Sequence, residues 1–200
     1  MNRIGTKRLS TRRLILRPFS LEDAPAMFQN WANDPEVSRY VTWPPHGQLS
    51  VTQALLEEWT SQYSNPDFYH WCITKRENGE AIGDISVVKQ SQRDCSCEIG
   101  YCLSRAYWGN GIMTEAFFAV LDFLFTQVQF HRVEAEHVIE NPASGNVMKK
   151  CGLQFEGISR ESTLLLSDHQ FHDIAHYAIL QKDWVSKKTN DISDEKRHTL

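Results

Sequence analysis

The chain has 200 residues, of which 41% are hydrophobic and 23% are charged, and these values predict a single globular domain with a sizeable core. Its net charge of −4 argues against nucleic acid as the main partner, because that binding requires clustered positive charge. No apolar run is long enough to span a membrane, no signal-peptide pattern is present, and the five cysteines lack a disulfide spacing, so we expect a reduced, cytoplasmic protein.

The first half of the chain moves from helical to strand periodicity. Residues 1–10 are expected to be disordered or extended, and one domain is expected over residues 11–184. The dipeptide Asn78-Gly79 is the strongest short hairpin signal and separates two alternating segments. The expected elements are, in order, an edge strand, a helix, a rigid aromatic loop, a second helix and the two strands of a hairpin: 12–17, 20–33, 39–45, 50–61, 70–75 and 81–89.

The second half alternates strands and helices. Apolar residues such as Ala116, Val120 and Phe123 recur at helical spacing, and Gly152 is placed as a left-handed helix cap. Residues 185–200 are polar and are expected to form a flexible tail. The expected elements are, in order, a strand, a long helix, a strand, a short helix and a final hairpin: 97–104, 112–127, 132–139, 144–151, 155–166 and 171–180.

The glycine turn between residues 104 and 112 organises this second half. A strand enters a turn that contains Gly109 and Gly111, and a helix leaves it, so backbone N–H groups and the helix dipole should form an anion site. A P-loop is excluded, because one residue separates the glycines and no Lys follows. A dinucleotide fingerprint is weak, because Thr114 stands where the third glycine is needed.

A third glycine motif fits better. The run Tyr107-Trp108-Gly109-x-Gly111-x-x-Thr114-Glu115-Ala116 resembles the Q/R-x-x-G-x-G/A turn of the GNAT superfamily, the Gcn5-related N-acetyltransferases. A second block agrees: it runs from Asn141 and Ser144 through Val147, Lys150 and Gly152 to Phe155-Glu156-Gly157. Both blocks are similar to the branch of ribosomal-protein serine/alanine N-terminal acetyltransferases, over residues 11–184.

Two positions depart from the pattern of that superfamily. Its Gln/Arg falls on Ala106, with Arg105 beside it, so the sequence does not decide whether Arg105 contacts phosphate. Many members carry a Tyr at the position of Met148, and Met cannot serve as the proton donor that Tyr provides.

The resemblance implies an α+β, three-layer fold: a mixed, mostly antiparallel twisted sheet of about seven strands with helices on both faces. It also implies an acyltransferase that uses acetyl-CoA, with the pyrophosphate on the glycine turn, the pantetheine along residues 99–103, and a backbone N–H near Cys102 or Leu103 facing the thioester oxygen. The expected acetyl-CoA-binding residues are Ile99, Tyr101, Cys102, Leu103, Ser104, Trp108, Gly109, Asn110, Gly111, Ile112, Met113, Thr114, Asn141, Ser144 and Asn146.

Two residues are candidates for catalysis. Glu98 occupies the strand position where histone-type members carry a base, although it could instead be a surface strand residue. Ser144 could protonate the departing thiolate, contact the pantetheine, or cap the helix that follows. The expected acceptor-pocket residues are Tyr40, Trp43, Glu161 and Tyr177.

The acceptor is less specified than the donor. We expect the acceptor to be the α-amino group at the N-terminus of a ribosomal or other protein. The alternative functions are acetylation of a small amine (polyamine, aminoglycoside or metabolite) and a non-catalytic acyl-CoA-binding sensor. No metal is expected, because Cys95-x-Cys97 has no second pair at zinc spacing and the histidines at 169, 172 and 176 straddle a turn and a strand. No nucleic acid or membrane partner is expected either. The protein is expected to be a monomer or a homodimer.

Overall fold

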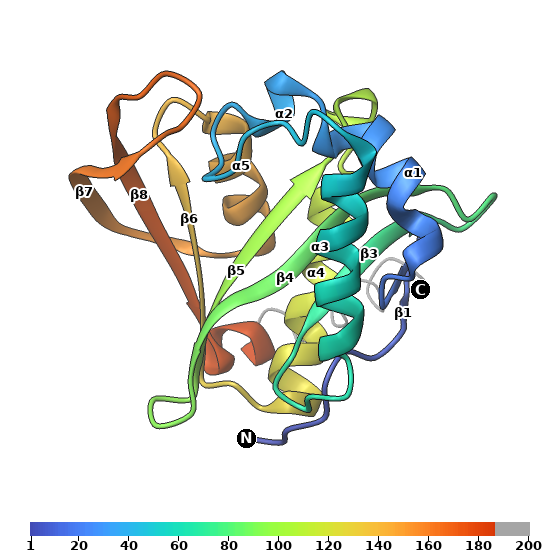
Figure 1. Cartoon of the computed structure of the whole chain (residues 1–200). Coiled ribbons are helices and arrows are strands. Elements are labelled where there is room, and N and C mark those ends of the chain that lie inside the picture. The colour runs from blue at the N-terminus through green and yellow to red at the C-terminus, as the bar shows by residue number, and fades with distance from the viewer. Residues whose placement is uncertain (187–200) are drawn as a thin grey trace, which may run out of the picture.

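The computed structural model describes residues 1–186 (Figure 1), so the predicted tail lies almost entirely outside the described residues. A single mixed sheet runs through the described part in the order β1-β2-β3-β4-β5-β6-β8-β7. β5 and β6 are parallel, and every other neighbouring pair is antiparallel. The strands are β1 (Leu9–Ser10), β2 (Leu14–Arg17), β3 (His70–Lys75), β4 (Ala81–Ser91), β5 (Ser96–Leu103), β6 (Arg132–Val138), β7 (Gln154–Leu164) and β8 (Phe171–Leu180).

The predicted mixed, mostly antiparallel sheet is confirmed, with eight strands in place of about seven. The additional strand is β1, where Leu9 pairs with Leu16 and Ser10 with Ile15 of β2. The chain before β1 is also held by main-chain hydrogen bonds, for example from the Gly5 N–H to the Pro66 oxygen over 2.8 Å.

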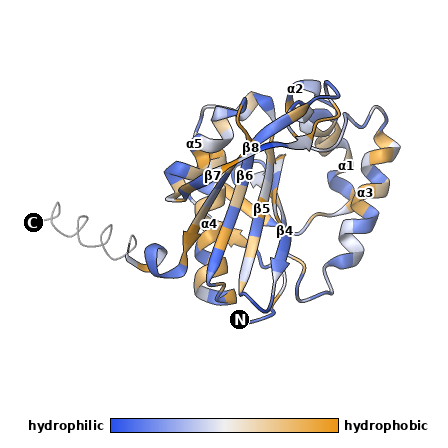
Figure 2. Ribbon diagram, turned by 90° about the vertical axis from the view of Figure 1, so that its left-hand side faces the viewer, coloured by the Kyte–Doolittle hydropathy of each residue, from blue (hydrophilic) through white to orange (hydrophobic). Residues whose placement is uncertain are grey.

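Helices cover both faces of the sheet, as predicted (Figure 2). α1 and α3 pack on one face, and α4 and α5 on the other. α1 continues into a wider turn over Phe28–Ala32, and α4 into one over Leu124–Val128. The short α2 was not predicted. The helices are α1 (Ala24–Met27), α2 (Pro35–Ser38), α3 (Leu49–Gln62), α4 (Ile112–Phe123) and α5 (Pro142–Cys151).

The main core lies between the sheet and α4. Ala116, Val120 and Phe123 are buried there, as their helical spacing predicts. A second core, which includes Trp31 and Leu56, lies between the sheet and the helices α1 and α3. Buried apolar surface on both sides of the sheet holds β4 and β5 in place, and this fixes the end of β5 that forms the site.

β5 and β6 pair only briefly before they separate. Their register runs from Ser96 opposite Arg132 to Glu98 opposite Glu134 and then stops, while β5 continues to pair with β4 as far as Leu103. Residues 99–103 therefore present main-chain groups on the β6 side without a partner in that strand. α4 crosses over between the two parallel strands, and ligands bind at the carboxyl ends of strands where such sheets open.

Two helix ends follow local rules. Gly152 closes α5 at a φ of +95°, as predicted. The helix begins at Pro142, however, and its cap is Asn141, whose side chain accepts a hydrogen bond from the Ser144 N–H. Ser144 is therefore not the cap, and its hydroxyl is available for other contacts. Within residues 1–186, no helix has the length and apolar character that crossing a bilayer requires.

Candidate active site

The glycine turn leads directly into α4. Gly109 and Gly111 have φ values of +74° and +70°, a region that side chains disfavour, and Gly111 is the N-cap of the helix. The first N–H groups of an α-helix have no intrahelical acceptor, and no side chain caps them here. The turn therefore has the geometry of an anion site, which fits the diphosphate of a coenzyme.

An ion pair between Arg13 and Glu115 supports the glycine turn. Glu115 lies in the first turn of α4, where its charge would repel an anion, but its carboxylate accepts hydrogen bonds from Arg13 N (2.8 Å), Arg13 Nε (2.6 Å) and the Thr11 hydroxyl. Arg13 also donates to the Asn110 oxygen over 3.0 Å. Burial opposes the charge of Glu115, yet these hydrogen bonds hold its pKa below the usual value.

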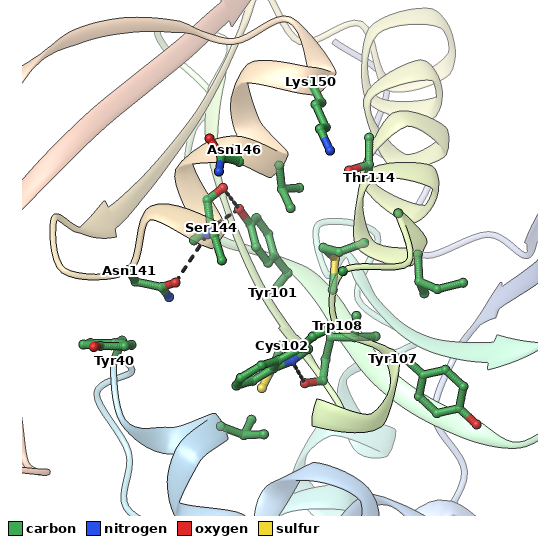
Figure 3. A pocket seen from close by; sticks show the side chains of 18 of the residues that line it. Tyr40, Tyr101, Cys102, Tyr107, Trp108, Thr114, Asn141, Ser144, Asn146 and Lys150 are labelled. Atoms are coloured by element: carbon green, nitrogen blue, oxygen red, sulfur yellow. Dashed lines mark hydrogen bonds between the residues drawn. The ribbon is translucent and has the colours of Figure 1, made fainter.

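A cavity of about 360 Å³ opens beside the turn, between α4, α5 and the separated end of β5 (Figure 3). This volume is in the range of small-molecule sites. The short α2 and the residues after it close one end, which brings the predicted acceptor residue Tyr40 into the lining. The predicted acetyl-CoA residues that line it are Tyr101, Cys102, Leu103, Trp108, Gly109, Gly111, Ile112, Met113, Thr114, Asn141, Ser144 and Asn146.

Three of the predicted acetyl-CoA residues do not line the cavity. Ile99 and Ser104 are buried, with exposed fractions of 2% and 4%. The Asn110 side chain donates to the Trp108 oxygen over 3.1 Å, and thereby shapes the turn without facing the cavity. Ile99 shares its face of β5 with Tyr101 and Leu103 but lies farther from the end of the strand, where its side chain belongs to the core under α4.

The structure does not bring Glu98 to the cavity. Its carboxylate lies 3.0 Å from Lys89 Nζ, and it precedes the point where β5 and β6 separate. Direct removal of a proton would require hydrogen-bond reach to the amine, which this position does not provide. The role of Glu98 as the base stays a prediction, and this geometry weighs against it.

Three predicted acceptor residues also lie outside the lining. Trp43 packs against the core of α1 and α3. Tyr177 is buried, and its ring lies against His137 and Phe155. Glu161 lies at an irregular position of β7, where its main-chain N–H donates to Asp173 Oδ1 over 2.8 Å. Tertiary packing of the aromatic rings and a strand irregularity separate these residues from the site.

The first turn of α5 forms one wall. Asn141 Oδ1 accepts from the Ser144 N–H, and the Tyr101 hydroxyl lies 2.9 Å from Ser144 Oγ and 3.0 Å from the Ser144 main-chain oxygen (Figure 3). Burial raises the pKa of Tyr101, so this phenol stays protonated at neutral pH. The sequence suggested both residues, but it did not predict their contact.

Lys150 is a lining residue that the sequence reasoning missed. It follows Asn146 by four residues, so both lie on the face of α5 that lines the cavity, and Figure 3 shows Lys150 across from Thr114 of α4. The motif spacing that includes Lys150 could have identified it. Arg105, by contrast, pairs with Asp34 over 3.0 Å and does not line the cavity.

At the other end of the cavity, the sequence predicted Tyr40 but not the residues around it. α2 and its neighbourhood contribute Glu36, Val37 and Val41, and Tyr107 adds to the lining beside the glycine turn. The indole of Trp108 donates to the Leu103 oxygen over 2.8 Å and so fixes the end of β5. Among the described residues, no group of three or more His, Cys, Asp or Glu could hold a metal ion.

The family model described as Acetyltransferase (GNAT) domain matches residues 13–154. The uncharacterized N-acetyltransferase p20 of Bacillus licheniformis is 32% identical over 177 residues, which cover 88% of this chain and 98% of that protein. The [ribosomal protein uS5]-alanine N-acetyltransferase of Escherichia coli K12 is 26% identical over 186 residues, which cover 89% of this chain and 93% of that protein. The crystal structure of microcin C7 self immunity acetyltransferase MccE, in complex with acetyl-CoA and AMP, superposes with a TM-score of 0.75 at 18% identity, over 85% of this chain and 93% of that one.

The fold and the glycine turn are those expected of an acyltransferase that uses a coenzyme. The chain belongs to the GNAT family of acetyltransferases. It is an N-acetyltransferase, and acetyl-CoA is the acyl donor of this family.

Proposed function

We propose that the protein transfers the acetyl group of acetyl-CoA directly to the α-amino group of a protein or peptide N-terminus. The charges of the residues that line the cavity support this choice of acceptor. Among the described residues that line it, Glu36 is the one acid and Lys150 the one base. A polyamine or aminoglycoside presents several cationic amines and favours several carboxylates, whereas a single α-amino group does not. The similarity to a uS5-alanine N-acetyltransferase supports the same choice.

The donor is held mainly through the main chain. The N–H groups around Gly109 and Gly111 bind the diphosphate, and the open edge of β5 binds the pantetheine arm. A main-chain N–H near Cys102 or Leu103 then faces the thioester oxygen and stabilises the oxyanion that forms there. In the best-studied case, loss of one such donor costs about 3–4 kcal/mol.

The acceptor needs little help to lose its proton. An α-amino group has a pKa of about 8, against about 10.4 for a lysine side chain, so a fair fraction is neutral at neutral pH. A lysine acceptor would require a stronger base than the lining residues provide. This difference favours N-terminal over side-chain amines.

Ser144 is the proposed proton donor to the departing thiolate. Its hydroxyl lines the cavity on the first turn of α5, and Asn141 performs the capping that could otherwise have occupied it. Direct transfer requires no acyl-enzyme, so Cys102 in the lining is not assigned a nucleophilic role.

An acceptor panel monitored by release of free CoA thiol tests the proposal. We expect acetyl-CoA with peptides that have a free N-terminus to release thiol, and the same peptides with a blocked N-terminus but a free lysine to release little. Faster turnover of polyamines or aminoglycosides would favour the small-amine alternative. Acetyl-CoA binding without release for any amine would instead favour a sensor.

A further inference from the structure

A pair of hydroxyl groups lies in the lining of the cavity. Tyr101 reaches from β5 to the first turn of α5, where its Oη lies 2.9 Å from Ser144 Oγ and 3.0 Å from the Ser144 main-chain oxygen (Figure 3). The other side of its ring packs on Phe117 of α4, with the centroids 5.5 Å apart. The phenol therefore connects the three elements that surround the cavity.

The positions of the hydrogens follow from a count of donors. A phenol has one hydrogen, and a main-chain oxygen can only accept. If Tyr101 donates to the main-chain oxygen, the 2.9 Å contact requires Ser144 to donate to Tyr101 Oη. If Tyr101 instead donates to Ser144 Oγ, the hydroxyl hydrogen of Ser144 is free to point into the cavity. Tyr101 thus decides where the hydrogen of Ser144 points.

We propose that Tyr101 is the positioning residue of Ser144: in the reactive arrangement its phenol donates to Ser144 Oγ, and Ser144 donates its own hydrogen to the sulfur of the departing thiolate. This proposal rests on the acetyl transfer proposed above and deepens it.

The proton transfer balances without any further reactant. The amine nitrogen forms a bond to the acetyl carbon, the C–S bond breaks, and its electron pair stays on sulfur. The hydrogen of Ser144 moves to sulfur, and the proton lost by the nitrogen returns to Ser144 Oγ. Both hydroxyls end as they began, and the products are an amide and free CoA thiol.

Two observations explain why a phenol from β5 orients Ser144. Met148 occupies the α5 position where many family members carry a Tyr, and it is only 1% exposed, so its thioether belongs to the core and offers no hydrogen. Burial also raises the pKa of Tyr101, which keeps its hydrogen available as a donor throughout the pH range of the reaction. The hydrogen bond that orients Ser144 therefore comes from β5 and not from α5.

The test is a double-mutant cycle with Tyr101→Phe and Ser144→Ala in the full chain. The Phe variant keeps the ring and its packing on Phe117 but loses the hydroxyl. We expect each single change to lower kcat about tenfold, with the KM for acetyl-CoA within about twofold. Since Tyr101 acts through Ser144, the double variant should be no slower than Ser144→Ala alone.

Tyr69→Phe is the matched control, because it removes a buried phenol outside the cavity whose hydrogen-bond contacts are both 3.4 Å, and it should leave kcat unchanged. Calorimetry with acetyl-CoA should give the same Kd for the wild type and for Tyr101→Phe, which excludes loss of folding. Multiplicative losses in the double variant, or an unchanged kcat in Tyr101→Phe, would overturn the positioning role alone. A wild type that releases no thiol with any amine would overturn the proposed function itself.

Discussion

A Cβ atom added to Gly145 would lie 2.4 Å from Nε2 of His137, so the first turns of α5 rest directly on the imidazole of β6. The ring is fixed on its other side, because Nδ1 lies 2.7 Å from the Val138 oxygen and the imidazole stacks on Tyr177. This contact sets the height of α5 above the sheet, and with it the position of Ser144 in the cavity wall.

We therefore expect Gly145→Ala to destabilise the protein. Neither the helix backbone nor the stacked ring can move far, and extra volume in a packed site typically costs about 1–3 kcal/mol. Urea unfolding should show this loss in the free energy of unfolding. Combining the change with His137→Ala removes the obstructing ring, so the double variant should be more stable than the sum of the two single effects predicts. An unchanged stability in Gly145→Ala would show that this contact is not tight.

The ion pair behind the glycine turn should make stability depend on pH. Hydrogen bonds lower the folded-state pKa of Glu115, so it stabilises the fold above its unfolded-state pKa of about 4.3 and loses that contribution as the pH falls through the folded value. We expect Glu115→Gln to cost about 1 kcal/mol at pH 7. The difference from the wild type should shrink below about pH 4, which urea unfolding across pH can measure. A constant difference at all pH values would contradict this account.

Local sequence rules predicted the elements that position the site. The Asn78-Gly79 turn, Gly152 after α5 and the two glycines before α4 act over a few residues, so their structural consequences are visible in the sequence. The contacts inside the site are of another kind. Tyr101 and Ser144 are 43 residues apart, and Arg13 and Glu115 are 102 apart. No periodicity connects such pairs, because packing of the elements alone brings them together.

The position of Glu98 also depends on contacts that local sequence rules do not predict. Its position in the sequence motif suggested a catalytic base, but the exact point where β5 leaves β6 depends on strand pairing, which the sequence does not specify. Because its carboxylate lies outside the cavity and pairs with Lys89, we expect Glu98→Gln to keep kcat/KM within about threefold of the wild type between pH 6 and pH 9. Lys89→Met should give the same result. A loss for Glu98→Gln that is confined to low pH, where the amine is protonated, would instead identify Glu98 as the base acting through water.

Two adjacent lysines allow the binding of the donor phosphates to be tested. Lys150 lines the cavity, whereas its neighbour Lys149 points to the Tyr177 ring, with Nζ 5.9 Å from the ring centroid. If main-chain amides provide most of the binding, Lys150→Met should raise the Kd for acetyl-CoA by about tenfold without abolishing binding, and Lys149→Met should leave it unchanged. Calorimetry at two salt concentrations should show a weaker salt dependence for Lys150→Met.

Dephospho-CoA, which lacks the 3′-phosphate, shows which phosphate Lys150 contacts. If the wild type and Lys150→Met bind dephospho-CoA equally well, the lysine contacts the 3′-phosphate; if the tenfold difference persists, it contacts the diphosphate on the glycine turn. Complete loss of binding in Lys150→Met, with the fold intact, would contradict the view that the amides around Gly109 and Gly111 provide most of the affinity, since a cationic side chain would then be the principal ligand of the diphosphate.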